Sequence, residues 1–101
     1  MTRIRPLAGG RHAVYRIASD LLLVFKPRGH REAEHVHPHP QRLRVLRGRL
    51  QVRGPRVREL TPTSRPYRLP AGRPHSTVAL ADTWLLAERI HTKATPPTTR
   101  R

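Results

Sequence analysis

The chain has 101 residues, no cysteine, and only one Trp, one Phe and two Tyr. The absence of cysteine excludes disulfide crosslinks and a thiolate-ligated zinc site, so a bound metal would need nitrogen or oxygen ligands. With 36% hydrophobic residues, the chain can build one thin core. We expect a single domain at residues 13–90, an N-terminal segment at 1–12, and a polar, proline-rich tail at 91–101 that is disordered.

Long apolar runs are missing as well. No run reaches the roughly 18 to 20 residues that a membrane-spanning helix requires, and the first five residues are not followed by the apolar stretch of a signal peptide. We therefore expect a cytoplasmic protein without a membrane partner.

Acidic residues are scarce: six Asp and Glu stand against 21 Lys and Arg, which gives a formal net charge of +15. Such a charge attracts phosphate and other anions. However, Lys26 and Lys93 are the only lysines, the arginines are spread along the chain, and few aromatic side chains are available to stack on bases. We expect a small anionic ligand, and a basic nucleic-acid-binding barrel is only the third hypothesis.

Eleven prolines and six glycines argue against long helices. Strands are predicted at 13–18 and 21–25, the second apolar enough for burial on both faces, and at 67–69, 76–80 and 83–90. Leu43, Val45, Leu50 and Val52 alternate with polar residues, which predicts a hairpin that turns at Gly48. We expect Trp84 in the core or at a dimer interface. The fold class is all-β, a barrel or sandwich with little or no helix.

Histidines are concentrated in one short part of the chain. Side chains two apart on a strand point to the same side, about 6.6 Å apart, so His35 and His37 could share one ion. His75, on a distant strand, could join them if the sheet closes on itself. First-row divalent metals favour imidazole nitrogen. The alternative is a solvated, histidine-rich loop that binds metal adventitiously.

Two spaced patterns carry a family resemblance: Gly29-x5-His35-x-His37-x3-Gln41-x6-Gly48 and Pro70-x-Gly72-x2-His75. They resemble the paired motifs of the cupin superfamily, over residues 13–90. The resemblance implies a small jelly-roll β-barrel, commonly a homodimer, with iron, nickel, manganese, zinc or copper inside. Its ligands would be His35, His37 and His75, with Gln41 in the place of the family's Glu. Ser64 and Ala79 also depart from the second motif, at turn or packing positions.

Gln41 leaves two interpretations open. A carboxamide is a neutral and weaker ligand than a carboxylate, so the ion would bind less tightly and keep its full charge. The first interpretation is an open three-histidine site for dioxygenase, isomerase or lyase chemistry on a small, anionic molecule. The second is a degenerate metal site in a non-enzymatic ligand-binding or sensor barrel.

Of four further polar residues, two could serve this site and two are not expected to. His39 shares the parity of His35 and could be a fourth ligand or a general base, or else a surface residue at the barrel mouth. Glu88 in the last strand could face the pocket as a proton acceptor. Glu32 and Glu34 have the opposite parity to His35, so neither is expected to replace the missing carboxylate.

Overall fold

The computed structural model describes residues 2–6 and 12–91, and every regular element in this part of the chain is a β-strand. The strands are β1 (Thr2–Pro6), β2 (Ala13–Ala18), β3 (Leu21–Lys26), β4 (Arg31–His35), β5 (Gln41–Arg47), β6 (Leu50–Arg53), β7 (Val57–Leu60), β8 (Tyr67–Leu69), β9 (His75–Ala79) and β10 (Thr83–Arg89). The predicted all-β class is confirmed. No helix long and apolar enough to cross a membrane occurs among the described residues. Most of the predicted tail, residues 92–101, lies outside them.

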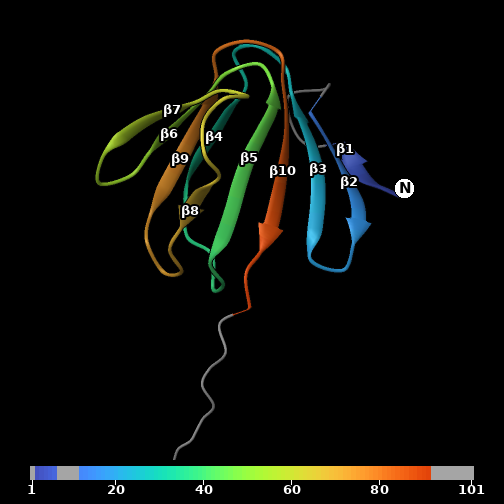
Figure 1. Ribbon diagram of the computed structural model, residues 1–101, viewed down its shortest axis with the longest axis horizontal. Coiled ribbons are helices and arrows are strands. Elements are labelled where there is room, and N and C mark those ends of the chain that lie inside the picture. Colours follow the sequence, from blue (N-terminus) through green and yellow to red (C-terminus); the bar gives the residue numbers. More distant parts are fainter. Residues whose placement is uncertain (1, 7–11, 92–101) are drawn as a thin grey trace, which may run out of the picture.

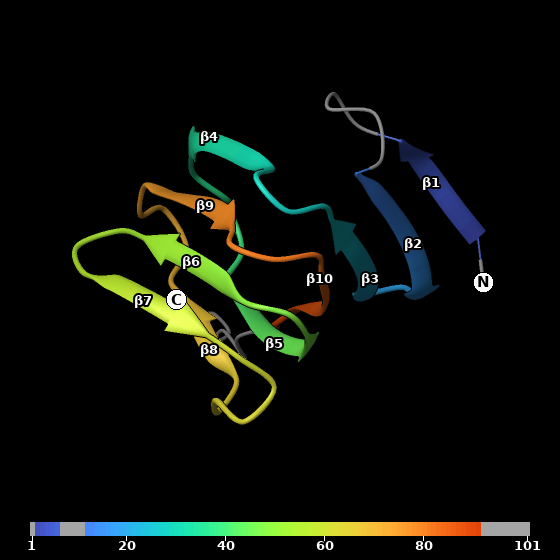
Figure 2. The same ribbon diagram turned by 90° about the horizontal axis from the view of Figure 1, so that it is seen from above.

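The strands form two antiparallel sheets (Figure 1). One sheet has the order β1-β2-β3-β10-β5-β8, and the other has the order β4-β9-β6-β7. Figure 2 shows the sheets as two layers, with β1 at the far edge of the larger one. Strands that are neighbours in the sequence often lie in different layers, so the chain crosses repeatedly from one sheet to the other.

The core lies between the two layers and is built by alternate residues of facing strands. Leu50 and Val52 in β6 are 0% and 1% exposed, and Leu85 in β10 is 2% exposed. Removal of this apolar surface from water drives the sheets together. The buried cluster consists of Val24, Leu43, Val45, Leu50, Val52, Leu60, Leu69, Leu85 and Ala87.

The predicted hairpin around Gly48 is wrong. β5 pairs with β10 and β8, whereas β6 pairs with β9 and β7, so the chain passes from one sheet to the other at this turn. Gly48 does make the turn, with φ of 99°, and Leu43 and Leu50 both face the core. Alternation fixes which face of a strand is buried, but a strand arched between two sheets has the same alternation as a hairpin.

β3 is not fully buried on both faces. Val24 points into the core and is buried, whereas Leu23 and Phe25 lie on the outer face and are half-buried. Trp84 is also on this outer face, with ring centroids 4.8 Å from Phe25 and 6.5 Å from Tyr15. The larger sheet therefore has an apolar, aromatic outer surface, and Trp84 belongs to it rather than to the inner core.

Candidate metal centre

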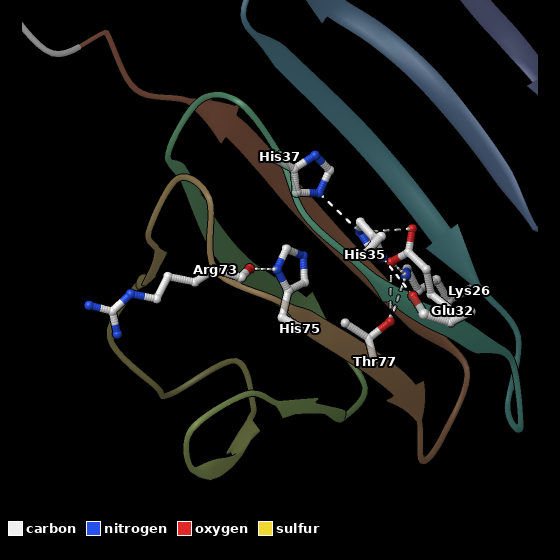
Figure 3. A network of polar contacts seen from close by, with 8 residues as sticks. Lys26, Glu32, His35, His37, Arg73, His75 and Thr77 are labelled. Carbon is white, nitrogen blue, oxygen red and sulfur yellow. Dashed lines mark hydrogen bonds and ion pairs between the residues drawn. The ribbon is translucent and has the colours of Figure 1, made fainter.

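Three imidazoles converge at one end of the smaller sheet (Figure 3). His35 ends β4, His37 lies in the connection that follows, and His75 begins β9. One ligand nitrogen from each lies within 4.8 Å of the other two. His35 Nε2 and His37 Nε2 are 3.0 Å apart. The structure thus brings together the three histidines that the two sequence patterns singled out.

Backbone pairing explains why residues so distant in sequence meet. β4 and β9 are antiparallel neighbours, and His35 lies directly opposite His75. The turn before His75 contains Gly72 at a φ of 72°, and its N–H donates to the carbonyl oxygen of His37 at 2.9 Å. A positive φ favours glycine, which has no Cβ to clash. The ladder and the turn together hold the two segments in position.

Backbone carbonyls orient two of the rings. His35 Nδ1 donates to the carbonyl oxygen of Ala33 at 2.6 Å, and His75 Nδ1 donates to that of Arg73 at 3.3 Å. With Nδ1 protonated, Nε2 of each neutral ring carries a lone pair. Such contacts to the far nitrogen are typical of metal-ligating histidines.

The pKa values of His37 and His75 are both lowered. Burial is the main cause in each case, and a charge on the adjacent His35 would lower the pKa further. Both rings are therefore neutral near pH 7, the form in which imidazole binds metal. The donor set fits a divalent first-row transition metal.

His37 and His75 border a cavity of about 150 Å³ between the sheets. Gln41, the first residue of β5, is half-buried and lines it together with His37 and His75. Leu43, Leu50 and Leu85 supply apolar wall. The position of Gln41 is compatible with the predicted role of its amide as a ligand, which stays a prediction.

The prediction that Glu32 points away from the histidines is wrong. Its Oε2 lies 3.7 Å from His35 Nε2, and its side chain lines the cavity. The β4–β9 ladder shifts register between Glu32 and His35. A bulge of this kind breaks strict alternation, so residues of opposite parity reach the same face. The site therefore contains a carboxylate after all, from β4 rather than from position 41.

An ion pair with the buried Lys26 holds this carboxylate, and sequence analysis missed it. Lys26 is 5% exposed, and its Nζ donates to Glu32 Oε1 and to Thr77 Oγ1, both at 3.0 Å. Burial alone would raise the pKa of Glu32, but the charge and hydrogen bond of Lys26 outweigh it and lower that pKa. Strand alternation could have indicated the buried lysine. Lys26 lies two residues after Val24, which faces inward, so Lys26 lies on the same face.

The two candidates for acid–base roles lie away from the cluster. His39 is exposed in the connection between β4 and β5. Glu88 shares the parity of Trp84, so it points outward, where it lies 3.7 Å from Arg42 Nε. Neither His39 nor Glu88 belongs to the converging group.

No protein-family model and no curated protein sequence matches this chain. Among solved structures, a cupin superfamily protein from Desulfitobacterium hafniense aligns with a TM-score of 0.65 and 14% identity, over 79% of this chain and 76% of the other. The chain has the cupin fold. KdgF from Halomonas gives a TM-score of 0.62 and 24% identity, with coverages of 81% and 79%.

A larger cupin-fold neighbour contains a metal. The ribosomal oxygenase from Escherichia coli, in a complex with cobalt and succinic acid, gives a TM-score of 0.66 and 21% identity. The match covers 75% of this chain and 24% of the oxygenase. At such identities the likeness shows the shared fold, and the chemistry of this cupin-fold chain depends on its own residues.

Proposed function

We propose that this chain is a metal-binding cupin that acts on a small, anionic molecule through a divalent metal held by His35, His37 and His75. The observation that carries the proposal is the convergence of three imidazole nitrogens within 4.8 Å at a cavity. Iron, nickel, manganese, zinc and copper all suit such a set. The cobalt complex of the E. coli oxygenase supports metal binding on this fold.

The charges around the cavity favour an anionic ligand. The imidazoles and Gln41 are neutral ligands, and Lys26 and Glu32 form an ion pair whose charges cancel. A bound divalent ion would therefore keep a local charge near +2 and would polarise a bound ligand oxygen as a Lewis acid. Leu43, Leu50 and the other apolar wall residues limit water in the cavity.

Glu32 is the group best placed to move a proton. Its Oε2 is directed toward His35, and its Oε1 is held by Lys26. Because Lys26 keeps Glu32 ionised, Oε2 can accept a proton from a ligand bound beside the histidines. Proton transfer next to a Lewis acid fits isomerase or lyase chemistry, and the open three-histidine set also fits a dioxygenase.

The neutral amide of Gln41 supports a second candidate function. A site without its usual carboxylate binds metal less tightly, so the barrel could bind a ligand or act as a sensor without turnover. Replacing Gln41 by Glu distinguishes the two functions. If the wild-type protein contains no metal and only Gln41→Glu binds it, the chain has lost its metal chemistry, and the ligand-binding function is favoured.

The decisive experiment is elemental analysis of protein purified without a histidine tag. We expect near-stoichiometric metal in the wild type and its loss in His35→Ala and His75→Ala. His39→Ala is the matched control, because it removes an exposed histidine outside the cluster. Unchanged metal content in the cluster variants would overturn the proposed centre.

Gln41→Glu should bind metal more tightly than the wild type. A carboxylate in the ligand shell adds a charge directly opposite that of the ion. Loss of an outer-shell partner already changes metal affinity by about 10- to 100-fold, so we expect a gain of at least ~10-fold. Competition with a chelator measures it. Equal or weaker affinity would show that Gln41 is outside the ligand shell.

We propose that a second copy of this chain covers the outer face of the larger sheet. Half-buried Tyr15, Phe25 and Trp84 form an aromatic cluster there. Arg42 and Glu88 lie side by side on the same sheet. A two-fold axis through this face would place aromatic against aromatic and each charge within reach of its opposite, which supports a homodimer.

A further inference from the structure

His12 is a further polar residue that lines the cavity, and no sequence pattern indicated it. It immediately precedes β2, is 3% exposed, and lines the same cavity as His37 and His75. Neither of its ring nitrogens has a hydrogen-bond partner among the described residues. Buried polar atoms are almost always satisfied, because leaving them unpaired costs free energy. The two orphaned nitrogens therefore point to a ligand group that the cavity takes up.

The ring of His30 packs against the ring of His12, and His30 does not line the cavity. The two ring centroids are 4.1 Å apart, and the planes are tilted by 54°. His30 Nδ1 is also buried without a partner in the described part of the chain. The contact restricts the orientation of the His12 ring, so His30 acts as a positioning residue for it.

The hydrogen-bond donors at the cavity decide what kind of group could bind beside His12. Burial, followed by the nearby His30 and Lys26, lowers the pKa of His12 to about 4. The ring is therefore neutral near pH 7 and offers one N–H donor. Lys26 directs two of its N–H bonds to Glu32 and Thr77, and the described residues supply no acceptor for the third. Glu32 balances the charge of Lys26, so hydrogen bonding decides the fit: a carboxylate oxygen could accept from both the His12 N–H and the third N–H of Lys26.

We propose that His12 and Lys26 form a second subsite that binds the far carboxylate of a small acid, whose other end reaches the three histidines. This inference rests on the proposed metal-binding function and narrows its ligand to acids with two polar ends. The cavity volume of about 150 Å³ suits a short molecule. Apolar walls from Val24, Leu43 and Leu85 suit an aliphatic linker between the two ends.

The test uses full-length protein loaded with Co²⁺, and the visible absorption of the metal reports binding. Acetate is compared with unbranched dicarboxylates from malonate to glutarate. We expect at least one dicarboxylate to bind ~10-fold more tightly than acetate, which corresponds to about 1.4 kcal/mol. The chain length that binds most tightly then reports how far the second subsite lies from the metal.

Variants of His12 test whether this residue causes the higher affinity for dicarboxylates than for acetate. His12→Phe should reduce dicarboxylate affinity to that of acetate, with acetate affinity and cobalt content unchanged. His12→Asn, which keeps polar hydrogen-bonding atoms, should recover part of the gain. His39→Phe removes an exposed imidazole and should match the wild type. Dicarboxylates that bind no tighter than acetate to wild-type protein, or a gain that survives in His12→Phe, would overturn the subsite.

A metal-free measurement separates this inference from the metal proposal. In protein treated with a chelator, nitrogen NMR of labelled histidine should show His12 ring resonances shifting when a dicarboxylate is added. If the wild type takes up no cobalt but these resonances shift, the metal proposal fails and the subsite stands. If cobalt binds and the His12 resonances do not move, the subsite fails alone.

Discussion

At the scale of single residues, the burial of His12 makes the free energy of unfolding depend on pH. Its pKa falls from 6.5 to about 4, because burial penalises the charged ring. Above pH 6.5 both the folded and the unfolded states are neutral at this residue. As the pH falls from 6.5 toward 4, the unfolded state takes up the proton first, so the free energy of unfolding decreases. The full effect is on the order of 3 kcal/mol, at about 1.4 kcal/mol for each pH unit.

Urea unfolding of metal-free protein at pH 7 and pH 5 tests this expectation. Wild-type protein should lose stability between the two values, and His12→Phe should lose about 2 kcal/mol less, because the titrating ring is gone. His39→Phe is the control, since it removes an exposed ring, and it should follow the wild type. An identical pH dependence in His12→Phe and wild type would show that His12 is not held neutral by the fold.

At the scale of elements, Gly48 controls how the chain passes from β5 to β6. Its φ of 99° strains any other residue, and a Cβ there would meet the Asp82 carbonyl oxygen and lie 2.6 Å from Thr83 Oγ1. The neighbouring contact is rigid, because Thr83 is fully buried and its hydroxyl donates to the carbonyl oxygen of Arg49. Gly48 is therefore required both for its backbone conformation and for the missing side chain.

Gly48→Ala should lower the free energy of unfolding by at least ~2 kcal/mol, from backbone strain plus the clash. Gly29→Ala is the matched control: Gly29 also has a positive φ, of 86°, but a Cβ there meets nothing within 4 Å. The control should lose only about 1 kcal/mol, from strain alone. Chemical denaturation compares the two variants, and equal losses would mean that the turn relaxes around the new methyl group.

At the scale of the whole molecule, the outer face of the larger sheet predicts the assembly state. A face with half-buried Phe25 and Trp84 is stabilised when a second copy removes it from water. We expect sedimentation velocity to show a dimer that dissociates on dilution. Trp84→Arg should shift the equilibrium to monomer, because a charge would be buried in the interface.

Val57→Arg is the matched control for this prediction. Val57 is 61% exposed on β7, in the other sheet, so the same substitution there leaves the proposed interface intact. It should sediment like the wild type. A monomeric wild type at all concentrations, or dissociation by both variants alike, would contradict the proposed interface.

The fold class, the inward faces of β5 and β6, and the three histidines could all be predicted from the sequence, whereas the sequence prediction put Glu88 of β10 on the wrong face. These depend on local properties: glycine and proline punctuation, alternation along a strand, and motif spacing. Alternation failed at Glu32, where a register shift in β4 turns the side chain into the cavity. A bulge depends on the partner strand, and the sequence of one strand does not encode it.

Strand pairing and the set of polar residues that share the cavity became clear only from the three-dimensional arrangement. Gly48 looks the same in a hairpin and in a crossover between sheets, because strand partners are chosen by long-range packing. Alternation with Val24 places Lys26 on the inward face of β3, but nothing in the sequence indicates that His12 and Lys26 share one cavity. They become part of a site because β2, β3 and β9 bring them to the same cavity as His75. Closure of the two sheets around one small space is what converts scattered polar residues into a binding site.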